Sequence, residues 1–520
     1  MARTLAGVTR EHGRTYAGRP AITFEGATLT YDELDARSNR VARALRASGV
    51  ERGDRVALLD KNVPELLELV LGATRIGAVT VPVNWRLAPP EIRQIVNDAR
   101  AKVLVVGAEL DEAVHRIAGE LVTVDHFLDT APGGSRLSFA EWRDAQGDDD
   151  LTVPVDPHDV AIQFYTSGTT GLPKGAMLTH ANLFALLDAA NARLQLSDES
   201  VCLVSMPLFH VAGAGWALYG LANGSHNVML RDVDLEVILD VIERHRITHT
   251  VFVPALLQFL LMTPGVHDAD FSSLEAIIYG ASPISERVLS DAVRVFGCDF
   301  YQMYGLTETN GGVVVLPPAD HALGGPNAHR LRSAGVPLPG VALRIVAPDG
   351  TECPTGEVGE VWIHSPSTML GYWNMPEATA QAITTDGWFR SGDAGSVDAD
   401  GYLYIHDRVN DMIITGGENV YPAEVESALM SHPAVADAAV IGVPDERWGE
   451  TVKAVVVTVP EDDAPVTDDE LIAFTRERLA HYKCPTSVDR VDALPRNATG
   501  KVLRRVLREP YWTQHSRRVH

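Results

Sequence analysis

Strand-like and helix-like segments alternate through most of this 520-residue chain, and no other feature constrains its fold as strongly. Thr30 and Glu33 have the spacing of a capping box, in which each side chain accepts a hydrogen bond from the other residue's backbone at a helix start. We expect a helix there, a second helix at 90–100, and strands at 55–59, 79–83, 103–106, 160–165, 201–207, 249–254 and 276–279. This alternation is typical of α/β folds with largely parallel sheets.

The pattern changes twice towards the C-terminus. From residue 340 onward, short strands are separated by turns, which predicts a small β subdomain. After Arg408, helices and strands begin again over a stretch long enough for a separate α+β domain. A chain of 520 residues also exceeds the size at which a single core stops growing. We therefore expect an α/β fold with a large N-terminal domain at 1–408, which includes the β subdomain, and a C-terminal α+β domain at 409–520.

Composition narrows the possible partners and locations. A net charge of −25 argues against nucleic acid, because affinity for nucleic acid comes largely from clustered Lys and Arg. The four cysteines are far apart, so neither a disulfide framework nor a zinc site is indicated, and a cytoplasmic location is expected. The most apolar run, 251–262, is too short for a transmembrane segment, which needs ~20 residues. Arginines near the C-terminus are compatible with peripheral contact with an anionic membrane. The sequence does not indicate whether the protein is a monomer or an oligomer.

The run from 165 to 175 concentrates hydroxyl groups, glycines and one lysine in a loop after a predicted strand. Such a loop offers backbone N–H groups and side-chain donors to an anion, at the position where open α/β sheets bind ligands. It is not a Walker A loop, because Gly175 rather than Ser or Thr follows Lys174. A plain flexible loop is the alternative. The candidate triphosphate-binding residues are Thr166, Ser167, Gly168, Thr169, Thr170, Gly171 and Lys174.

Further clusters contain the groups needed to activate a carboxylic acid with ATP. Tyr304 could stack on adenine, and Glu308 could hold Mg²⁺, a hard ion that prefers carboxylate and phosphate oxygens. Asp393 lies in a tight turn and could accept hydrogen bonds from both ribose hydroxyls. Lys501 follows a glycine and could compensate the charge of a reacting phosphoryl group. Each cluster by itself is also compatible with an ordinary surface turn or a surface lysine.

Taken in order, these clusters resemble the motifs of the acyl-adenylate-forming superfamily, which includes acyl-CoA synthetases, amino-acid adenylation domains and beetle luciferases. The matching segments, which span nearly the whole chain, are 165–175, 304–308, 388–393, 407–408, 416–419 and 495–501. The resemblance implies that ATP and the acid bind to the N-terminal domain, and that a mobile C-terminal domain rotates between two half-reactions. In the first, the carboxylate attacks the α-phosphate of ATP and pyrophosphate leaves. In the second, a thiol displaces AMP.

The resemblance also implies roles for single residues. Lys501 is expected to stabilise the adenylation transition state, and Thr307 to contact the α-phosphate. Asp393 and Arg408 are expected to hold the ribose. Glu308 and Thr166 are expected to bind Mg²⁺. The residues expected beside the adenine are Gly280, Ala281, Ser282, Gln302, Met303 and Tyr304.

The hinge position departs from the family. The residue two after the arginine of the 407–408 motif is usually Asp or Lys, whereas here it is Asn410. An uncharged hinge can still rotate, because a hinge needs only a few residues that absorb the backbone change.

Two segments bear on the acid and on the acceptor. His210 resembles the aromatic gate between the acyl pocket and the pantetheine channel of acyl-CoA synthetases; the alternative is a core histidine hydrogen-bonded to the backbone. Amino-acid adenylation domains place an aspartate there, so an amino-acid substrate is not expected. Gly416, Gly417 and Glu418 resemble the stretch that lines the thiol channel of CoA ligases, which makes CoA the expected acceptor.

The expected acyl pocket is mostly apolar or small, and its members are Val211, Gly213, Trp216, Val253, Gly305 and Gly311. Trp216 either shortens this pocket or packs in the core. Each buried methylene contributes about 0.8 kcal/mol, so such a lining favours a hydrophobic acid. The motifs therefore predict a fatty acyl-CoA synthetase acting on a medium- or long-chain fatty acid. An aromatic or sterol-derived acid, or delivery of the acyl group to a carrier protein, are the alternatives.

Overall fold

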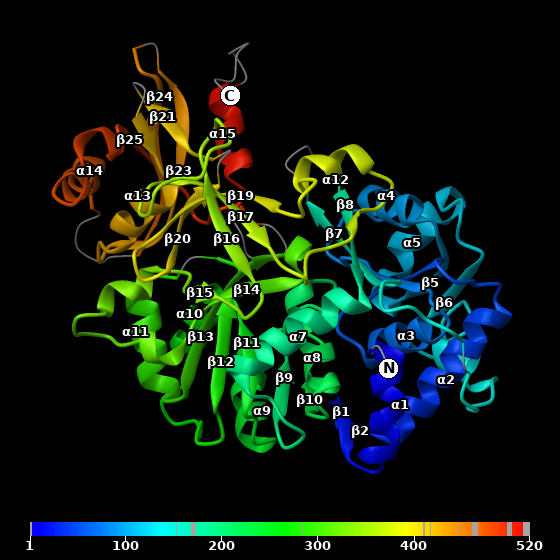
Figure 1. Cartoon of the computed structure of the whole chain (residues 1–520). Helices are drawn as coiled ribbons and strands as arrows, with labels where there is room; N and C mark the ends of the chain where they lie inside the picture. The colour runs from blue at the N-terminus through cyan, green and yellow to red at the C-terminus, as the bar shows by residue number, and fades with distance from the viewer. Residues whose placement is uncertain are drawn as a thin grey trace.

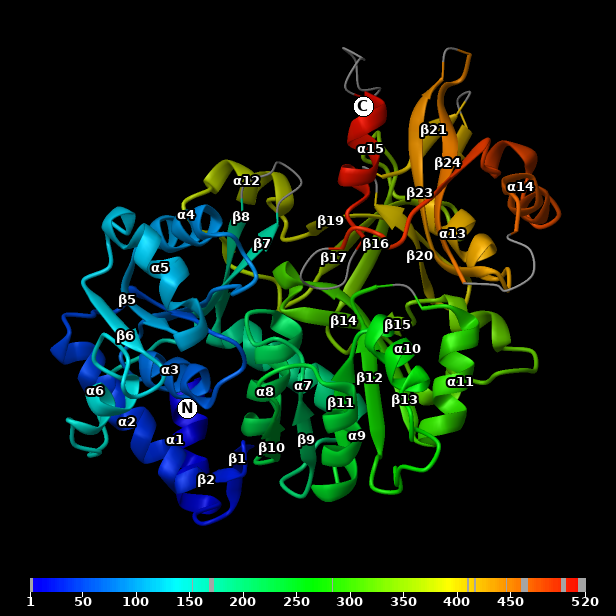
Figure 2. The same ribbon diagram turned by 180° about the vertical axis from the view of Figure 1, so that it is seen from behind.

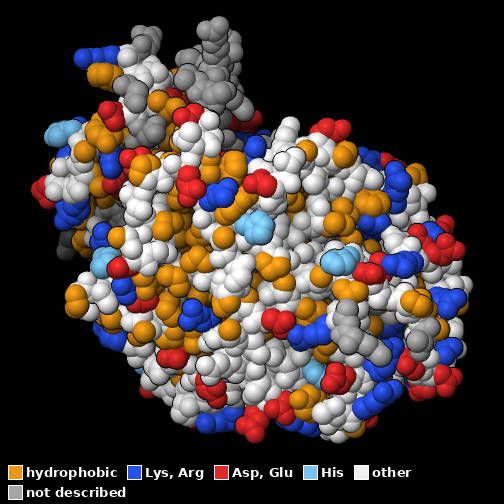
Figure 3. Space-filling model, in the orientation of Figure 1, with side chains coloured by type: hydrophobic (Ala, Val, Ile, Leu, Met, Phe, Trp, Pro, Cys, Tyr) orange, Lys and Arg blue, Asp and Glu red, His pale blue; other side chains and the backbone are white. Residues whose placement is uncertain are grey.

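The computed structural model describes residues 3–151, 153–167, 173–282, 284–408, 411–415, 418–445, 447–459, 466–496 and 502–512, apart from the side chains of Ser167, Arg408 and Asn419. Figures 1 and 2 show a large domain and, above it, a smaller domain that carries the C-terminal helix. The predicted fold class, an α/β protein with a β subdomain and a smaller α+β domain, is confirmed. Acidic and basic side chains are interspersed over the face seen in Figure 3.

Two large sheets form the framework of the large domain. The first has the order β15-β14-β13-β12-β11-β9-β10-β1-β2, and the second β18-β8-β7-β4-β3-β5-β6. The first comprises β1 (Pro20–Phe24), β2 (Ala27–Thr30), β9 (Val201–Val204), β10 (His226–Met229), β11 (His249–Phe252), β12 (Ala276–Gly280), β13 (Asp299–Leu306), β14 (Gly311–Leu316) and β15 (Val336–Pro337). The second comprises β3 (Arg55–Leu59), β4 (Val79–Pro82), β5 (Ala101–Val106), β6 (His126–Asp129), β7 (Val160–Ser167), β8 (Pro173–Thr179) and β18 (Gly371–Tyr372).

The central strands of both sheets are parallel, whereas β13 pairs with β14, and β7 with β8, in antiparallel fashion. Parallel strands need crossover connections, which here are helices that cover the sheet faces.

The largest hydrophobic core lies between the two sheets. It contains residues of α1 (Leu5–Thr15), α2 (Tyr31–Ala47), α3 (Pro64–Arg75), α7 (His180–Leu194) and α8 (Val211–Ala222). A second core joins the first sheet to α9 (Leu235–Arg244), α10 (Pro254–Met262) and α11 (Glu286–Phe296). A third joins the second sheet to α4 (Pro89–Ala99) and α5 (Asp111–Ile117), and α6 (Phe139–Asp144) packs beside α2. Each sheet is thus buried on both faces, as its nearly continuous apolar strands require.

A small antiparallel sheet links the two domains, in the order β16 (Ala342–Val346), β17 (Gly359–His364), β19 (Phe389–Val397) and β20 (Leu403–Arg408), with α12 (Pro376–Ala382) before β19. The smaller domain contains β21 (Ile413–Thr415), β22 (Glu418–Val420), β23 (Val435–Asp445), β24 (Gly449–Thr458) and β25 (Ser487–Arg490). Its helices are α13 (Pro422–Met430), α14 (Asp468–Arg476) and α15 (Arg504–Trp512). These elements enclose cores of their own.

The prediction that rested on a side-chain hydrogen-bonding pattern is confirmed, whereas the predicted ends of strands were less exact. The capping box of Thr30 and Glu33 is present at the start of α2. The strand predicted at 249–254 ends at Phe252 instead, because Pro254 occupies the first turn of α10, where its missing N–H costs nothing. The strand predicted at 201–207 ends at Val204. Within the described part of the chain, every helix is too short or too polar to cross a membrane.

Candidate functional site

A cavity of about 1050 Å³ opens at the carboxyl ends of the parallel strands β11, β12 and β13. Its wall also includes residues of β7, β8, α7, α8 and β19, so both large sheets and the small sheet contribute. This edge of an open α/β sheet is the usual place for a ligand. Many residues singled out from the sequence line it: Thr166, Lys174, His210, Val211, Trp216, Val253, Gly280, Ala281, Met303, Gly305, Thr307, Glu308 and Gly311.

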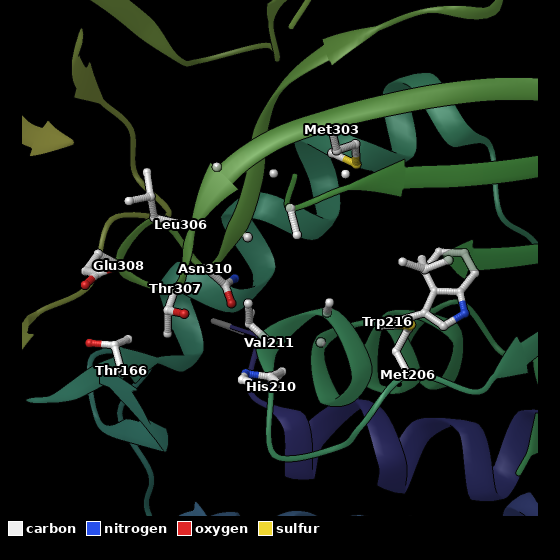
Figure 4. A pocket seen from close by; sticks show the side chains of 18 of the residues that line it. Thr166, Met206, His210, Val211, Trp216, Met303, Leu306, Thr307, Glu308 and Asn310 are labelled. Atoms are coloured by element: carbon white, nitrogen blue, oxygen red, sulfur yellow. The ribbon is translucent and has the colours of Figure 1, made fainter. Parts of the chain in front are cut away.

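The polar and apolar residues lie at different ends of this cavity. Figure 4 shows Thr166, Thr307 and Glu308 on one side, with Trp216 and Met303 on the other. His210 and Val211 lie between the two groups (Figure 4). The cavity therefore has a polar end suited to a nucleotide and an apolar end suited to a hydrocarbon group.

A short turn between β13 and β14 presents Thr307 and Glu308 to the polar end. Thr309 closes this turn: its Oγ1 accepts a hydrogen bond from the Leu306 N–H at 2.9 Å and lies 2.8 Å from the Gly311 carbonyl oxygen. Gly311 leaves the turn with φ of +110°, a conformation that L side chains rarely adopt. The turn is thus fixed by its own hydrogen bonds and by one glycine.

Glu308 is held at the cavity wall by a second sheet. Its Oε1 accepts a hydrogen bond from the Tyr372 hydroxyl at 2.8 Å, and Tyr372 lies in β18 of the second large sheet. Glu308 is only 9% exposed, yet it lines the cavity together with Thr166. A carboxylate and a hydroxyl oxygen are donors that suit Mg²⁺.

Asp393 lies just behind the wall rather than in it. It is buried on β19, and its Oδ2 accepts a hydrogen bond from the Tyr304 hydroxyl at 2.6 Å. Its neighbours Ser391 and Gly392 line the cavity. Gln302 is also behind the wall, where its Oε1 accepts a hydrogen bond from the Tyr279 hydroxyl at 3.2 Å.

One predicted pocket residue has a different role. Among the described residues that line the cavity, Gly213 is absent. A Cβ atom at Gly213 would lie 2.2 Å from the Pro207 carbonyl oxygen and 2.6 Å from that of Met206. Gly213 therefore allows α8 to pack closely against the segment before it, and a place for Gly213 in the acyl pocket stays a prediction. Ser282 likewise does not belong to the described wall of the cavity.

Helix α7, for which the sequence predicts no pocket residue, supplies much of the apolar end. The residues that it places in the wall are spaced at helical intervals along one face: Leu183, Leu186, Leu187, Ala190 and Leu194. From α8, the facing residues include Val211, Gly215 and Tyr219. The spacing of the leucines is visible in the sequence, but it does not distinguish a pocket wall from a core face.

Trp216 belongs to both the cavity wall and the hydrophobic core. Its Nε1 donates a hydrogen bond to the Leu203 carbonyl oxygen at 3.0 Å, which fixes the indole ring, and the side chain is buried. Trp216 therefore packs in the core, as one of the two alternatives stated, and that it shortens the acyl pocket stays a prediction.

Comparison with known proteins places this site in a family. The model of the AMP-binding enzyme family matches residues 9–373, and the model of its C-terminal domain matches residues 424–501. The chain belongs to the AMP-binding enzyme family. As a member, it is an acyl-adenylate-forming acid–thiol ligase, as the motifs predicted.

Curated relatives of this AMP-binding enzyme cover nearly its whole length. It is 42% identical to the fatty acid–[acyl-carrier-protein] ligase ScoC of Streptomyces coeruleorubidus, over 99% of this chain and 98% of that protein. It is also 42% identical to a feruloyl-CoA synthase of an Amycolatopsis species, over 94% of this chain and 96% of that protein. Its fold is similar to ATP-bound MatB from Rhodopseudomonas palustris, with a TM-score of 0.88 and 32% identity over 98% of this chain and 99% of MatB.

Several predicted residues of this AMP-binding enzyme lie outside the described residues, namely Gly168, Thr169, Thr170, Gly171, Asn410, Gly416, Gly417 and Lys501, as do the side chains of Ser167 and Arg408. Glu418 begins β22 and is exposed.

His210 is the titratable group between the two ends of the cavity. It is the N-cap residue of α8, but its side chain makes no capping hydrogen bond, and its buried Nε2 has no hydrogen-bond partner. Burial, with a smaller contribution from the nearby Arg86, lowers the pKa of His210 to about 4. The imidazole is therefore neutral at pH 7, and its Nε2 does not make the backbone bond that the core alternative required.

Buried neutral histidines predict a loss of stability in acid. Burial lowers the pKa of His180, His210, His226 and His249 to about 4, from an ordinary value of 6.5. Between pH 6.5 and 4 the unfolded chain binds protons at these sites that the folded chain does not, so the free energy of unfolding falls as pH falls. Each site contributes at most about 3 kcal/mol to this fall. Denaturant titrations at several pH values between 7 and 4 measure it.

A single variant isolates one of these histidines. The His180 Nδ1 accepts a hydrogen bond from the Leu5 N–H at 3.2 Å, and the side-chain oxygen of His180→Asn can accept it instead. This variant should lose less stability than the native chain between pH 6.5 and 4. Equal losses in the two proteins would contradict the assignment.

Proposed function

We propose that this AMP-binding enzyme activates a medium- or long-chain fatty acid with ATP, and then transfers the acyl group to CoA with release of AMP and pyrophosphate. The observation that carries the proposal is the apolar wall formed by α7 and α8, which begins beside the Thr307 turn and leads away from it. The facing leucines of α7 extend from Leu183 to Leu194, a length of roughly 16 Å at the rise of an α-helix. An extended hydrocarbon chain suits a wall of this length.

Contacts near Gly311 support continuity between the reacting carboxylate and this wall. A Cβ atom at Gly311 would lie 3.8 Å from both Leu186 of α7 and Val211 of α8. The space at Gly311 thus lies directly between the two helices and four residues from Thr307. An acid whose carboxylate lies at Thr307 would pass its chain through this space.

In the first half-reaction, we infer that an oxygen of the acid attacks the α-phosphorus of ATP and that the bond to the departing pyrophosphate breaks. Thr166 and Lys174 would bind the phosphates, with Ser167, Gly168, Thr169, Thr170 and Gly171 of the same loop. Thr307 and Lys501 would donate to the phosphate oxygens as negative charge develops there. Glu308 and Thr166 would hold Mg²⁺, which neutralises phosphate charge when it is bound. Asp393 and Arg408 would orient the ribose.

In the second half-reaction, the thiol sulfur attacks the acyl carbonyl carbon, and AMP leaves as the acyl–oxygen bond breaks. The neutral state of His210 and the absence of a hydrogen-bond partner for its Nε2 support a gating role between the acyl and thiol spaces. Gly416, Gly417 and Glu418 would line the thiol channel. We propose that the domains divide at 1–408 and 409–520, with Asn410 as the hinge between them.

A carrier protein is the second candidate for the acceptor. It is favoured by the 42% identity to a fatty acid–[acyl-carrier-protein] ligase over nearly the full length of both chains. The similarity to a feruloyl-CoA synthase instead supports an aromatic acid as the alternative substrate. We also propose a cytoplasmic location, which the four free cysteines support.

One set of assays tests the proposal. Release of AMP and pyrophosphate is measured with ATP and Mg²⁺ for unbranched acids from acetate to octadecanoate, and for ferulate, benzoate and a sterol side-chain acid. Formation of the thioester is followed with CoA and, separately, with a phosphopantetheinylated carrier protein. We expect a maximum among the fatty acids of medium or long chain, with transfer to CoA. A maximum at ferulate or another ring acid would refute the substrate, and transfer to the carrier protein alone would refute the acceptor.

A further inference from the structure

The chain passes from the large to the small domain between Asp407, near the end of β20, and Asp411, just before β21. Both carboxylates contact the same side chain. Nη1 of Arg504 lies 3.2 Å from Oδ1 of Asp407 and 3.4 Å from Oδ2 of Asp411. One guanidinium therefore spans the crossing between the domains from both sides.

The opposite edge of this guanidinium is fixed within the small domain. Nη2 of Arg504 lies 2.9 Å and 2.8 Å from the two carboxylate oxygens of Glu426 in α13, and its Nε donates to Oε1 at 3.1 Å. Glu426 Oε1 also accepts a hydrogen bond from the Val440 N–H at 2.8 Å. The side chains of Arg504 and Glu426 are only 14% and 11% exposed, so solvent screens this bidentate pair weakly.

Asp407 is held by the small domain at a second point. Its Oδ2 accepts a hydrogen bond at 2.9 Å from the Ala423 N–H in the first turn of α13. Any rotation at the crossing displaces Asp407 relative to Arg504 and α13. The pair of Arg504 with Glu426, in contrast, lies inside the small domain and moves with it. The contacts of Asp407 consequently depend on the orientation of the domains.

Arg504 also lies three residues after Lys501, which is outside the described residues. The residues on either side of 497–501 contact each other: Arg496 and Val502 form an isolated β-bridge, and the Leu503 N–H donates to the Pro495 carbonyl oxygen at 2.8 Å. Arg504 is the next residue after Leu503 and begins α15. The side chain that spans the crossing is thus attached directly to the residues that flank the segment containing Lys501.

We propose that Arg504 is a positioning residue that braces the crossing in one domain orientation and couples that orientation to the residues that flank Lys501. This inference rests on the proposed two-step function, in which the two half-reactions use different orientations. Loss of the brace shifts the balance between the orientations. The rates of the two half-reactions then change by different factors, whereas a general loss of stability would lower both together.

The test compares full-length Arg504→Gln with the native enzyme. The first half-reaction is measured as exchange of pyrophosphate into ATP with dodecanoate, and the second as transfer from synthetic dodecanoyl-adenylate to CoA. We expect the ratio of the two rates to shift about tenfold or more, the size expected when a buried charge pair loses one partner. The matched control is Arg505→Gln, which changes the exposed neighbouring arginine and should leave the ratio unaltered. An unchanged ratio in Arg504→Gln overturns the proposal.

A second measurement needs no substrate. Trypsin cleaves after arginine, so the rate of cleavage at Arg408 reports access to the crossing. We expect this rate to rise several-fold in Arg504→Gln, and also in Asp411→Asn, which removes one arm of the brace at a side chain that is 29% exposed. Asp411→Asn decides the matter if Arg504→Gln does not fold. Cleavage at the native rate in these variants overturns the proposed role of Arg504. Absence of pyrophosphate exchange by the native enzyme with every acid tested refutes only the proposed function.

Discussion

Lys501→Ala is expected to lower the rate of acyl-adenylate formation by roughly 10²- to 10³-fold, the usual cost of removing one well-placed donor at a developing charge. Attack of the carboxylate concentrates negative charge on the α-phosphate oxygens and on the departing pyrophosphate. A lysine ammonium beside them stabilises this transition state more than it stabilises bound ATP, so its loss reduces the rate of the step rather than the affinity.

Pyrophosphate exchange and single-turnover formation of acyl-adenylate measure this loss. Transfer of the acyl group from supplied acyl-adenylate should be much less affected, because that step breaks the bond between the acyl group and AMP and releases no pyrophosphate. Lys102→Ala serves as a control, since Lys102 lies on β5 and forms an ion pair with Asp54. Adenylate formation near the native rate in Lys501→Ala would refute the assignment.

Gly215→Leu should shift the preference of the enzyme from long-chain to short-chain acids. Gly215 lines the cavity in the middle of α8, and a Cβ atom there would meet only Val211 Cγ2, at 3.5 Å. A leucine can therefore be accommodated by the fold, while its isobutyl group occupies the space between α8 and α7. If it displaces about four methylenes of the acid at about 0.8 kcal/mol each, kcat/KM for long acids falls roughly hundredfold.

Short acids that end before Gly215 should keep nearly their native kcat/KM in Gly215→Leu. The matched control is Gly215→Ala, which adds one methyl group, fills little of the cavity and raises helix propensity. The readout is the profile of kcat/KM against chain length for the three proteins. A parallel fall for short and long acids would mean that Gly215 does not border the acyl chain.

The sequence was informative where chemistry is local. A capping box, a glycine- and hydroxyl-rich loop after a strand, and the Thr307–Glu308 pair can each be recognised from neighbouring residues, and Thr307 and Glu308 do line the cavity. It was less informative where the neighbours are distant in sequence. Gly213 was assigned to the pocket because its helix borders it, yet what surrounds Gly213 depends on the side of α8 that meets Met206 and Pro207.

For the same reason, the sequence predicts neither the pocket-lining face of α7 nor the hydrogen bond that holds Glu308. The α7 leucines have the pattern of any amphipathic or buried helix, and only the packing of α7 opposite α8 turns one face into a pocket wall. The hydrogen bond from Tyr372 to Glu308 joins residues 64 positions apart and follows from the pairing of β18 with β8. No local pattern reports such a contact.

The turn between β13 and β14 belongs to both ends of the cavity. Thr307 and Glu308 face the polar end, while Gly311, four residues after Thr307, borders Leu186 and Val211, where the apolar wall begins. A ligand that shifts or stiffens this turn from one end changes the free energy of binding at the other. Such linkage is reciprocal: if a bound fatty acid raises the affinity for ATP by some factor, bound ATP raises the affinity for that fatty acid by the same factor. Selectivity for chain length would then be expressed in the binding of the nucleotide as well as in the binding of the acid.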